Sequence, residues 1–130
     1  MTTIDRMAQS IREMGLDPVI DDGRSSVSVV YEMSTVVCVY DGGRGTVTMA
    51  SISRSGLPRE KRVQEAERCL RLNEITNIGK CFIDADGDQI MMYQAKLWHE
   101  EDISDIVKDG LGCLAAMKAM YIRMSIDFSR

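Results

Sequence analysis

The spacing of apolar residues divides the chain into helical and extended segments. Over residues 3–14 these residues lie three or four apart, on one face of a helix: Ile4, Met7, Ala8, Ile11 and Met14. A brief extended segment is predicted at 16–20, and the period then changes to two, as is typical of half-buried strands. This alternation predicts strands at residues 25–31 and 46–53. Between them, the nearly continuous β-branched and aromatic run at 35–40 predicts a central strand with both faces covered. The first half therefore predicts a helix followed by an antiparallel meander.

The second half combines a charged helix, a hairpin and a long apolar helix. The helix predicted at 59–76 has one apolar stripe, formed by Val63, Ala66, Cys69, Leu70 and Asn73. Asn73 is unusual in this stripe, because its amide needs hydrogen-bond partners. A last helix, beginning near residue 101, carries apolar residues at helical spacing as far as Met124. The element order predicts an α+β fold, α-β-β-β-(β)-α-β-β-α, with an antiparallel sheet of about five strands in a single domain over residues 1–130.

The hairpin between residues 79 and 97 is apolar on both faces. Asp86-Gly87 predicts a two-residue turn with positive φ at both positions. Pairing outward from this turn sets Ile83 opposite Ile90 and Cys81 opposite Met92 on one face. The other face then carries the remaining apolar residues, Phe82 opposite Met91, with Tyr93, Ala95 and Leu97 further along. One face must cover the core, and the other needs a helix, a second subunit or a bound partner.

Composition narrows the class of partner. The chain of 130 residues is 45% hydrophobic and 28% charged, as is ordinary for one globular domain. Its net charge of -4 argues against nucleic acid and anionic membranes as partners. The chain has no apolar run of the ~18 residues that a bilayer requires. Its first residues lack the pattern of a signal peptide, so a cytoplasmic location is expected.

The residues with reactive or ligating side chains form no recognisable catalytic or metal site. Four scattered cysteines without a Cys-x-x-Cys pair are expected to be buried core residues. The acidic run 84–88 resembles a calcium loop, but Gln89 and Ala95 stand where that loop needs glycine and glutamate, so a hairpin turn is favoured. His99 has acidic neighbours but no nucleophile context, and is expected at the surface. No catalytic residue, metal or cofactor is therefore predicted.

Three sequence features resemble one known family. They are Leu72-Asn73-Glu74-Ile75, then Gly79 to Asp84 followed by Asp86-Gly87, then the long helix from Glu101. In these features and in element order the chain is similar to the YbjN-type proteins, named as bacterial sensory transduction regulators, which share the fold of type III secretion chaperones. The resemblance implies a small, acidic, homodimeric α+β domain that binds protein. It supplies no catalytic residues.

Two functions follow as hypotheses, and an enzyme is not expected. The first is a non-catalytic protein-binding module, chaperone-like or regulatory, that acts as a homodimer. Its candidate protein-binding or dimer surface consists of Phe82, Met91, Tyr93, Leu97, Met117, Met120, Tyr121 and Met124. The alternative is a sensory regulator that binds a small ligand, which a pocket lined by Tyr31, Tyr40 or Tyr93 would favour.

Overall fold

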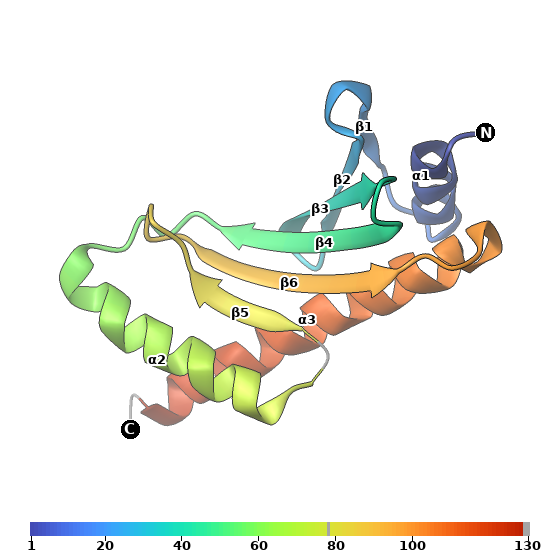
Figure 1. Cartoon of the computed structure of the whole chain (residues 1–130). Coiled ribbons are helices and arrows are strands. Elements are labelled where there is room, and N and C mark those ends of the chain that lie inside the picture. Colours follow the sequence, from blue (N-terminus) through green and yellow to red (C-terminus); the bar gives the residue numbers. More distant parts are fainter. Residues whose placement is uncertain (78, 129–130) are drawn as a thin grey trace.

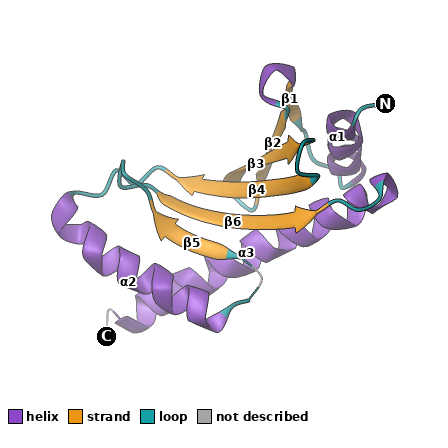
Figure 2. Cartoon of the chain, viewed as in Figure 1, coloured by secondary structure: helices purple, strands orange, loops and turns teal. Residues whose placement is uncertain are grey.

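The computed structural model describes residues 1–77 and 79–128, with side chains described through residue 124. This part of the chain forms three α-helices and one six-stranded sheet (Figures 1 and 2). The helices are α1 (Thr3–Glu13), α2 (Arg59–Ile75) and α3 (Ile103–Phe128). The strands are β1 (Val19–Asp21), β2 (Ser26–Tyr31), β3 (Ser34–Asp41), β4 (Thr46–Ser53), β5 (Lys80–Ile83) and β6 (Gln89–Lys96). Two short 3-10 helices, η1 (Asp22–Arg24) and η2 (Glu100–Asp102), precede β2 and α3.

The sheet is antiparallel throughout, in the order β1-β2-β3-β4-β6-β5. β6 pairs with β4 along the whole length of both strands, so the β5–β6 hairpin extends the meander directly. The predicted α+β fold and element order are confirmed. The sheet has one strand more than the five predicted. The additional strand is β1, because residues 19–21, predicted only as an extended segment, pair with β2.

The helices pack on one face of the sheet. α3 runs along this face, α1 lies over the β1–β2 end, and α2 lies beside the β5 edge (Figure 1). The core joins α1 and α3 to β2, β3 and β4, and includes Met7, Ile11, Val27, Cys38, Met49, Leu111 and Met117. A Cβ atom on Gly110 would lie 2.2 Å from the Met49 sulfur, so glycine allows α3 to approach the sheet closely. Each helix in the described part of the chain is too short or too polar to span a bilayer.

α1 begins at a capping box, as an N-terminal threonine allows. The Thr2 hydroxyl accepts a hydrogen bond from the Asp5 amide, and the Asp5 carboxylate accepts one from the Thr2 amide. The helix ends before Gly15, whose φ of +81° suits the left-handed residue that follows a helix.

The stripe predicted on α2 is wrong in part. Val63 and Leu70 are 68% and 62% exposed, whereas the buried residues are Cys69 and Leu72. In the described part of the chain α2 packs mainly against the edge strand β5 and against α3, so it buries a narrow strip. The two exposed residues lie on its outer side.

The predicted register of the hairpin is also wrong, by one residue. Cys81 pairs with Met91 and Phe82 pairs with Ile90. The connection spans residues 84–88, and within it Gly87 has a positive φ of +81° while Asp86 does not. This shift places Phe82 on the face of the sheet opposite to Met91, because neighbouring residues in a strand point to opposite faces.

Candidate functional site

One face of the sheet, which no helix in residues 1–77 and 79–128 covers, is rich in apolar side chains. We call it the helix-free face, and its apolar members are Val19, Val30, Val37, Val39, Ala50, Ile52, Phe82, Ile90 and Met92. None of them belongs to the main core cluster, although Ile90 is buried. An antiparallel sheet with one solvated face ordinarily carries polar residues there. The apolar residues therefore need a reason other than the monomer's own core.

Cross-strand pairing joins six of these residues into one band. Val37 pairs with Ala50, and Ala50 pairs in turn with Met92, which gives one apolar row across three strands. Beside this row, Ile52 pairs with Ile90, which pairs with Phe82. Directly opposed side chains in an antiparallel pair touch each other. The two rows thus form a continuous apolar band from β3 to β5.

The band is accessible at its margins and hollowed at two places. Val39 and Phe82 remain 39% and 40% exposed, and Val30 is 64% exposed. One hollow, of about 440 Å³, is lined by Met33, Ser34, Thr35, Val37, Ile52, Ser53, Arg54 and Lys118. A second, of about 250 Å³, is lined by Asn77, Gly79, Lys80, Met92 and Gln94. Both hollows are open, and both polar and apolar side chains line them.

The structure separates the candidate surface residues that the sequence grouped together. Only Phe82 lies on the helix-free face. Met91 and Met117 are buried in the core. The other five are partly buried against the core on the helix side: Tyr93, Leu97, Met120, Tyr121 and Met124. The sequence missed Val37, Val39, Ala50, Ile52 and Met92. The prediction that the strand at residues 35–40 is covered on both faces is wrong, because Val37 and Val39 lie on the helix-free face, where Val39 is 39% exposed.

The outer edge of β5 is closed by a side chain of α2. The Asn73 amide donates a hydrogen bond to the Cys81 carbonyl oxygen at 2.9 Å, and the Cys81 amide donates to the Asn73 Oδ1 at 2.7 Å. Asn73 thus takes the place that a neighbouring strand would occupy at this residue. The polar residue in the apolar stripe of α2 is explained by these two bonds, and strand addition at Cys81 is blocked.

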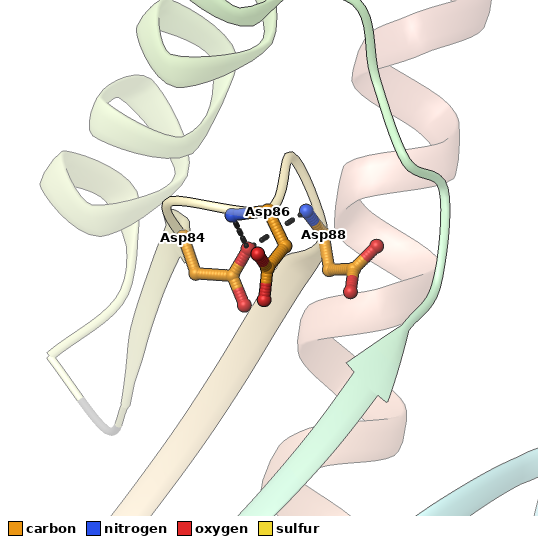
Figure 3. Close-up of side chains that lie close together, drawn as sticks. All are labelled: Asp84, Asp86 and Asp88. Carbon is orange, nitrogen blue, oxygen red and sulfur yellow. Dashed lines mark hydrogen bonds between the residues drawn. The ribbon is translucent and has the colours of Figure 1, made fainter.

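The acidic turn between β5 and β6 is braced by its own carboxylates (Figure 3). Asp84 Oδ1 accepts hydrogen bonds from the amides of Asp86 at 3.0 Å and Asp88 at 2.9 Å. The Asp88 carboxylate accepts one from the Gly56 amide at 3.0 Å, which ties the turn to the segment before α2. One oxygen from each of the three carboxylates lies within 4.8 Å of the others. These bonds give Asp84 and Asp88 a structural role in holding the hairpin connection.

A polar contact joins α2 to α3 behind the β5 edge. Arg68 and Glu65 form an ion pair at 2.9 Å, and the Tyr121 hydroxyl donates a hydrogen bond to the same Glu65 carboxylate. Burial raises the pKa of Tyr121 above its usual range, and the hydrogen bond to Glu65 raises it further. The neutral phenol is therefore held as a donor, which suits a structural contact between the helices.

The tyrosine pocket suggested by the sequence is very small where Tyr31 lines it. The cavity beside Tyr31, Val36, Ser51 and Leu114 has a volume of about 10 Å³, which is roughly the space of one water molecule. The Lys118 ammonium lies at its rim and donates to the Glu32 carbonyl and the Ser34 hydroxyl. This cavity is too small for an organic ligand.

Comparison with solved structures identifies the fold. YbjN from E. coli superposes with a TM-score of 0.70 at 11% sequence identity, over 97% of this chain and 92% of that one. The Yersinia pestis type III secretion chaperone SycH, solved in complex with a stable fragment of YscM2, gives a TM-score of 0.55 at 14% identity, over 97% and 98% of the two chains. The HopA1–SchA chaperone–effector complex gives 0.55 at 14%, over 87% and 88%. In sequence comparisons, neither a family description nor a curated protein gives a significant match.

The likeness to these structures confirms the fold that the sequence resemblance implied. The chain has the fold of YbjN and of type III secretion chaperones. At 11% to 14% identity the likeness extends to the fold and not to individual site residues.

Proposed function

We propose that this chain is a non-catalytic, chaperone-like protein-binding module whose helix-free face binds an extended, apolar segment of a partner protein. One observation carries the proposal: the continuous apolar band from β3 to β5, which none of the described helices covers. Large exposed apolar patches on otherwise charged proteins are characteristic of sites that bind other proteins.

The shape of the band suits an extended segment better than a folded domain. Its two rows run across the strands, and an open hollow lies at two places along it. Methionine side chains adapt to irregular apolar partners, and Met92 lies in this band. SycH and SchA, which share the fold, were both solved with bound protein partners.

We also propose that the chain acts as a homodimer in the cytoplasm. Its dimer surface is the outer side of α2 together with the neighbouring end of α3. Val63 and Leu70 are seven residues apart, on one side of α2, and Ile122 of α3 is 51% exposed. Met120 and Met124 of the same helix end are partly buried against the core, so Ile122 is the apolar residue that this end of α3 exposes. Dimerisation there leaves the helix-free face open for the partner segment.

The experiment measures binding of a permanently unfolded protein, reduced and carboxymethylated α-lactalbumin, by fluorescence anisotropy. The wild-type chain is expected to bind it and not the native form. Val39→Asp introduces a charge at the margin of the band and is expected to weaken binding by roughly tenfold or more. Leu70→Asp, on the outer side of α2, is the matched control and is expected to bind as the wild type does.

Two results would contradict the proposal. The first is a wild-type chain that does not bind the unfolded protein. The second is equal binding by Val39→Asp and the wild type, with circular dichroism showing that both are folded.

The alternative function, a sensory regulator that binds a small ligand, has weaker support. The cavity lined by Tyr31 holds about 10 Å³, and Tyr93 is packed against Gly110 of α3. The two larger hollows are open to solvent, whereas small-molecule sites usually bury most of their ligand.

A further inference from the structure

Two buried thiols, from cysteines twelve residues apart in the sequence, face each other between α2 and β5. The Cys69 and Cys81 sulfur atoms lie 3.1 Å apart, and each residue is 1% exposed. Cys69 belongs to the helix and Cys81 to the edge strand, so they join two different elements. From the sequence alone, each was expected only to fill the core.

The Cys81 thiol is held in this position by Asn73. Residues 69 and 73 lie one turn apart on the same side of α2. Asn73 bonds both backbone groups of Cys81 at 2.9 and 2.7 Å, which fixes the strand against the helix. The Cys81 side chain then points to Cys69, while its backbone is bonded to Asn73. The side of α2 that carries Cys69 and Asn73 thus sets both the position of β5 and the approach of the Cys69 and Cys81 sulfurs.

The other two cysteines have different surroundings. Cys38 lies in the centre of the sheet on β3, and Cys113 lies on α3 with its sulfur 3.8 Å from the Met117 sulfur. Both are buried, as Cys69 and Cys81 are. They therefore serve as internal references: burial is common to all four thiols, and the short sulfur–sulfur approach distinguishes one pair.

We propose that Cys69 and Cys81 form a redox-active dithiol that is converted reversibly to a disulfide by a small-molecule disulfide such as oxidised glutathione. This site is independent of whether the helix-free face binds a partner. Its oxidised form links α2 covalently to β5, the strand that carries Phe82.

The exchange proceeds in two balanced steps. The Cys69 thiolate attacks one sulfur of oxidised glutathione, expels one glutathione thiolate and forms a mixed disulfide. The Cys81 thiolate then attacks the Cys69 sulfur, expels the second glutathione thiolate and closes the Cys69–Cys81 bond. Each expelled thiolate takes up the proton that a protein thiol has lost. Two protein thiols and one oxidised glutathione thus give one protein disulfide and two reduced glutathione molecules.

The order of attack follows from the hydrogen bond between the thiols. The Cys81 thiol donates to the Cys69 sulfur, which lowers the pKa of Cys69 below its usual range and raises that of Cys81. Cys69 is therefore the first to ionise and attack.

Access of the oxidant needs a local opening, and the edge of the sheet is where this costs least. β5 has four residues, and its outer side at Cys81 is bonded by a side chain instead of a further strand. Short edge elements open more readily than central strands such as β3. Cys38 is expected to stay protected under conditions in which Cys69 and Cys81 react.

The test oxidises the folded wild-type chain with oxidised glutathione, blocks remaining thiols after denaturation, and maps the tryptic peptides by mass spectrometry. The intact chain is expected to lose the mass of two hydrogen atoms and to retain two alkylatable thiols. The linked pair is expected to join residues 69–71 to residues 81–96, because trypsin cleaves after Arg68, Arg71, Lys80 and Lys96. Dithiothreitol is expected to restore all four thiols.

Variants and hydrogen exchange sharpen the result. Cys113→Ser is expected to retain the linked peptide, whereas Cys69→Ser is expected to abolish it. Oxidation is also expected to slow amide exchange in β5 more than in β3. Four alkylatable thiols after oxidation, or links that involve Cys38 or Cys113 as often as the proposed pair, would overturn the proposal. The wild-type peptide map decides this even where a variant fails to fold.

Discussion

Asn73 replaces a neighbouring strand at the outer edge of β5, and its removal has a predictable cost. Asn73→Ala leaves the partly buried amide and carbonyl of Cys81 without their bonds. Leaving such groups unsatisfied costs about 1–3 kcal/mol in the free energy of unfolding. Urea unfolding measures the loss. Asn77→Ala, at an exposed position nearby, is the control and is expected to unfold as the wild type does. Equal midpoints for both variants would show that the Asn73 bonds contribute nothing net.

A single buried thiol makes stability depend on pH in the alkaline range. Burial raises the pKa of Cys38 from its usual 9.0 to about 12. The unfolded chain therefore releases this proton first. The contribution of the protonated Cys38 thiol to the free energy of unfolding is complete below pH 9. It is lost as the pH rises towards about 12, by up to roughly 1.4 kcal/mol per pH unit.

Cys38→Ala tests this dependence through a slope. The variant is expected to be less stable at neutral pH, because it leaves a cavity, but to lose less stability on going from about pH 8 to about pH 10. Urea unfolding at the two pH values measures both effects. Part of the alkaline loss should remain in the variant, since the pKa values of Cys81, Cys113, Tyr93 and Tyr121 are raised too. An unchanged slope would contradict the assignment to Cys38.

At the scale of elements, alanine substitutions at two glycines of α3 are expected to change the free energy of unfolding in opposite directions. A methyl group on Gly110 would lie 2.2 Å from the Met49 sulfur and 2.9 Å from a ring carbon of Tyr93, whereas one on Gly112 meets open space. Gly110→Ala is expected to destabilise the fold by about 1–3 kcal/mol, because Met49 is fully buried and has little room to move. Gly112→Ala is expected to stabilise it by up to ~1 kcal/mol through helix propensity.

Thermal unfolding of both variants measures whether the melting temperature falls for Gly110→Ala and rises for Gly112→Ala. A shift in the same direction for both would mean that α3 does not approach the sheet as closely as the Gly110 contacts indicate.

The hairpin shows where sequence reasoning succeeded and where it failed at this scale. Both strands were predictable from their apolar residues, and so was a turn near Gly87. The register was not, because it depends on hydrogen bonds made by side chains. Asp84 accepts from two amides within the connection and lengthens it beyond a two-residue turn. A shift of one residue exchanged the faces, and it moved Phe82 away from Met91 and Tyr93.

At the scale of the molecule, the order of the elements was readable and their placement was not. Period and turn residues predicted three helices and the meander, and the motif from Leu72 to Gly87 led to the fold shared with YbjN. Which sheet face the helices cover depends on the packing of α1 and α3 together. Val37 and Val39 of β3 lie on the face opposite to Val36 and Cys38, although all four read alike in the sequence. The candidate site could therefore be found only in three dimensions.

Two separate apolar surfaces, one on the sheet and one on α2, predict that assembly and partner binding can be separated by mutation. Light scattering of the wild-type chain over a wide range of concentration is expected to give about twice 14.6 kDa. Leu70→Asp places a charge on the outer side of α2 and is expected to give the mass of a single chain. Val39→Asp, on the helix-free face, is expected to remain dimeric while it loses affinity for the unfolded protein.

The reciprocal behaviour of these two variants is stronger evidence than either alone. A variant that merely unfolds would lose both properties, whereas Leu70→Asp should lose only the dimer and Val39→Asp only the partner. A wild-type mass of one chain at every concentration would exclude the dimer but leave the helix-free face as a partner site. Conversion of Val39→Asp to a single chain would instead show that a second copy of the protein covers this face, and the partner segment would then have to bind elsewhere.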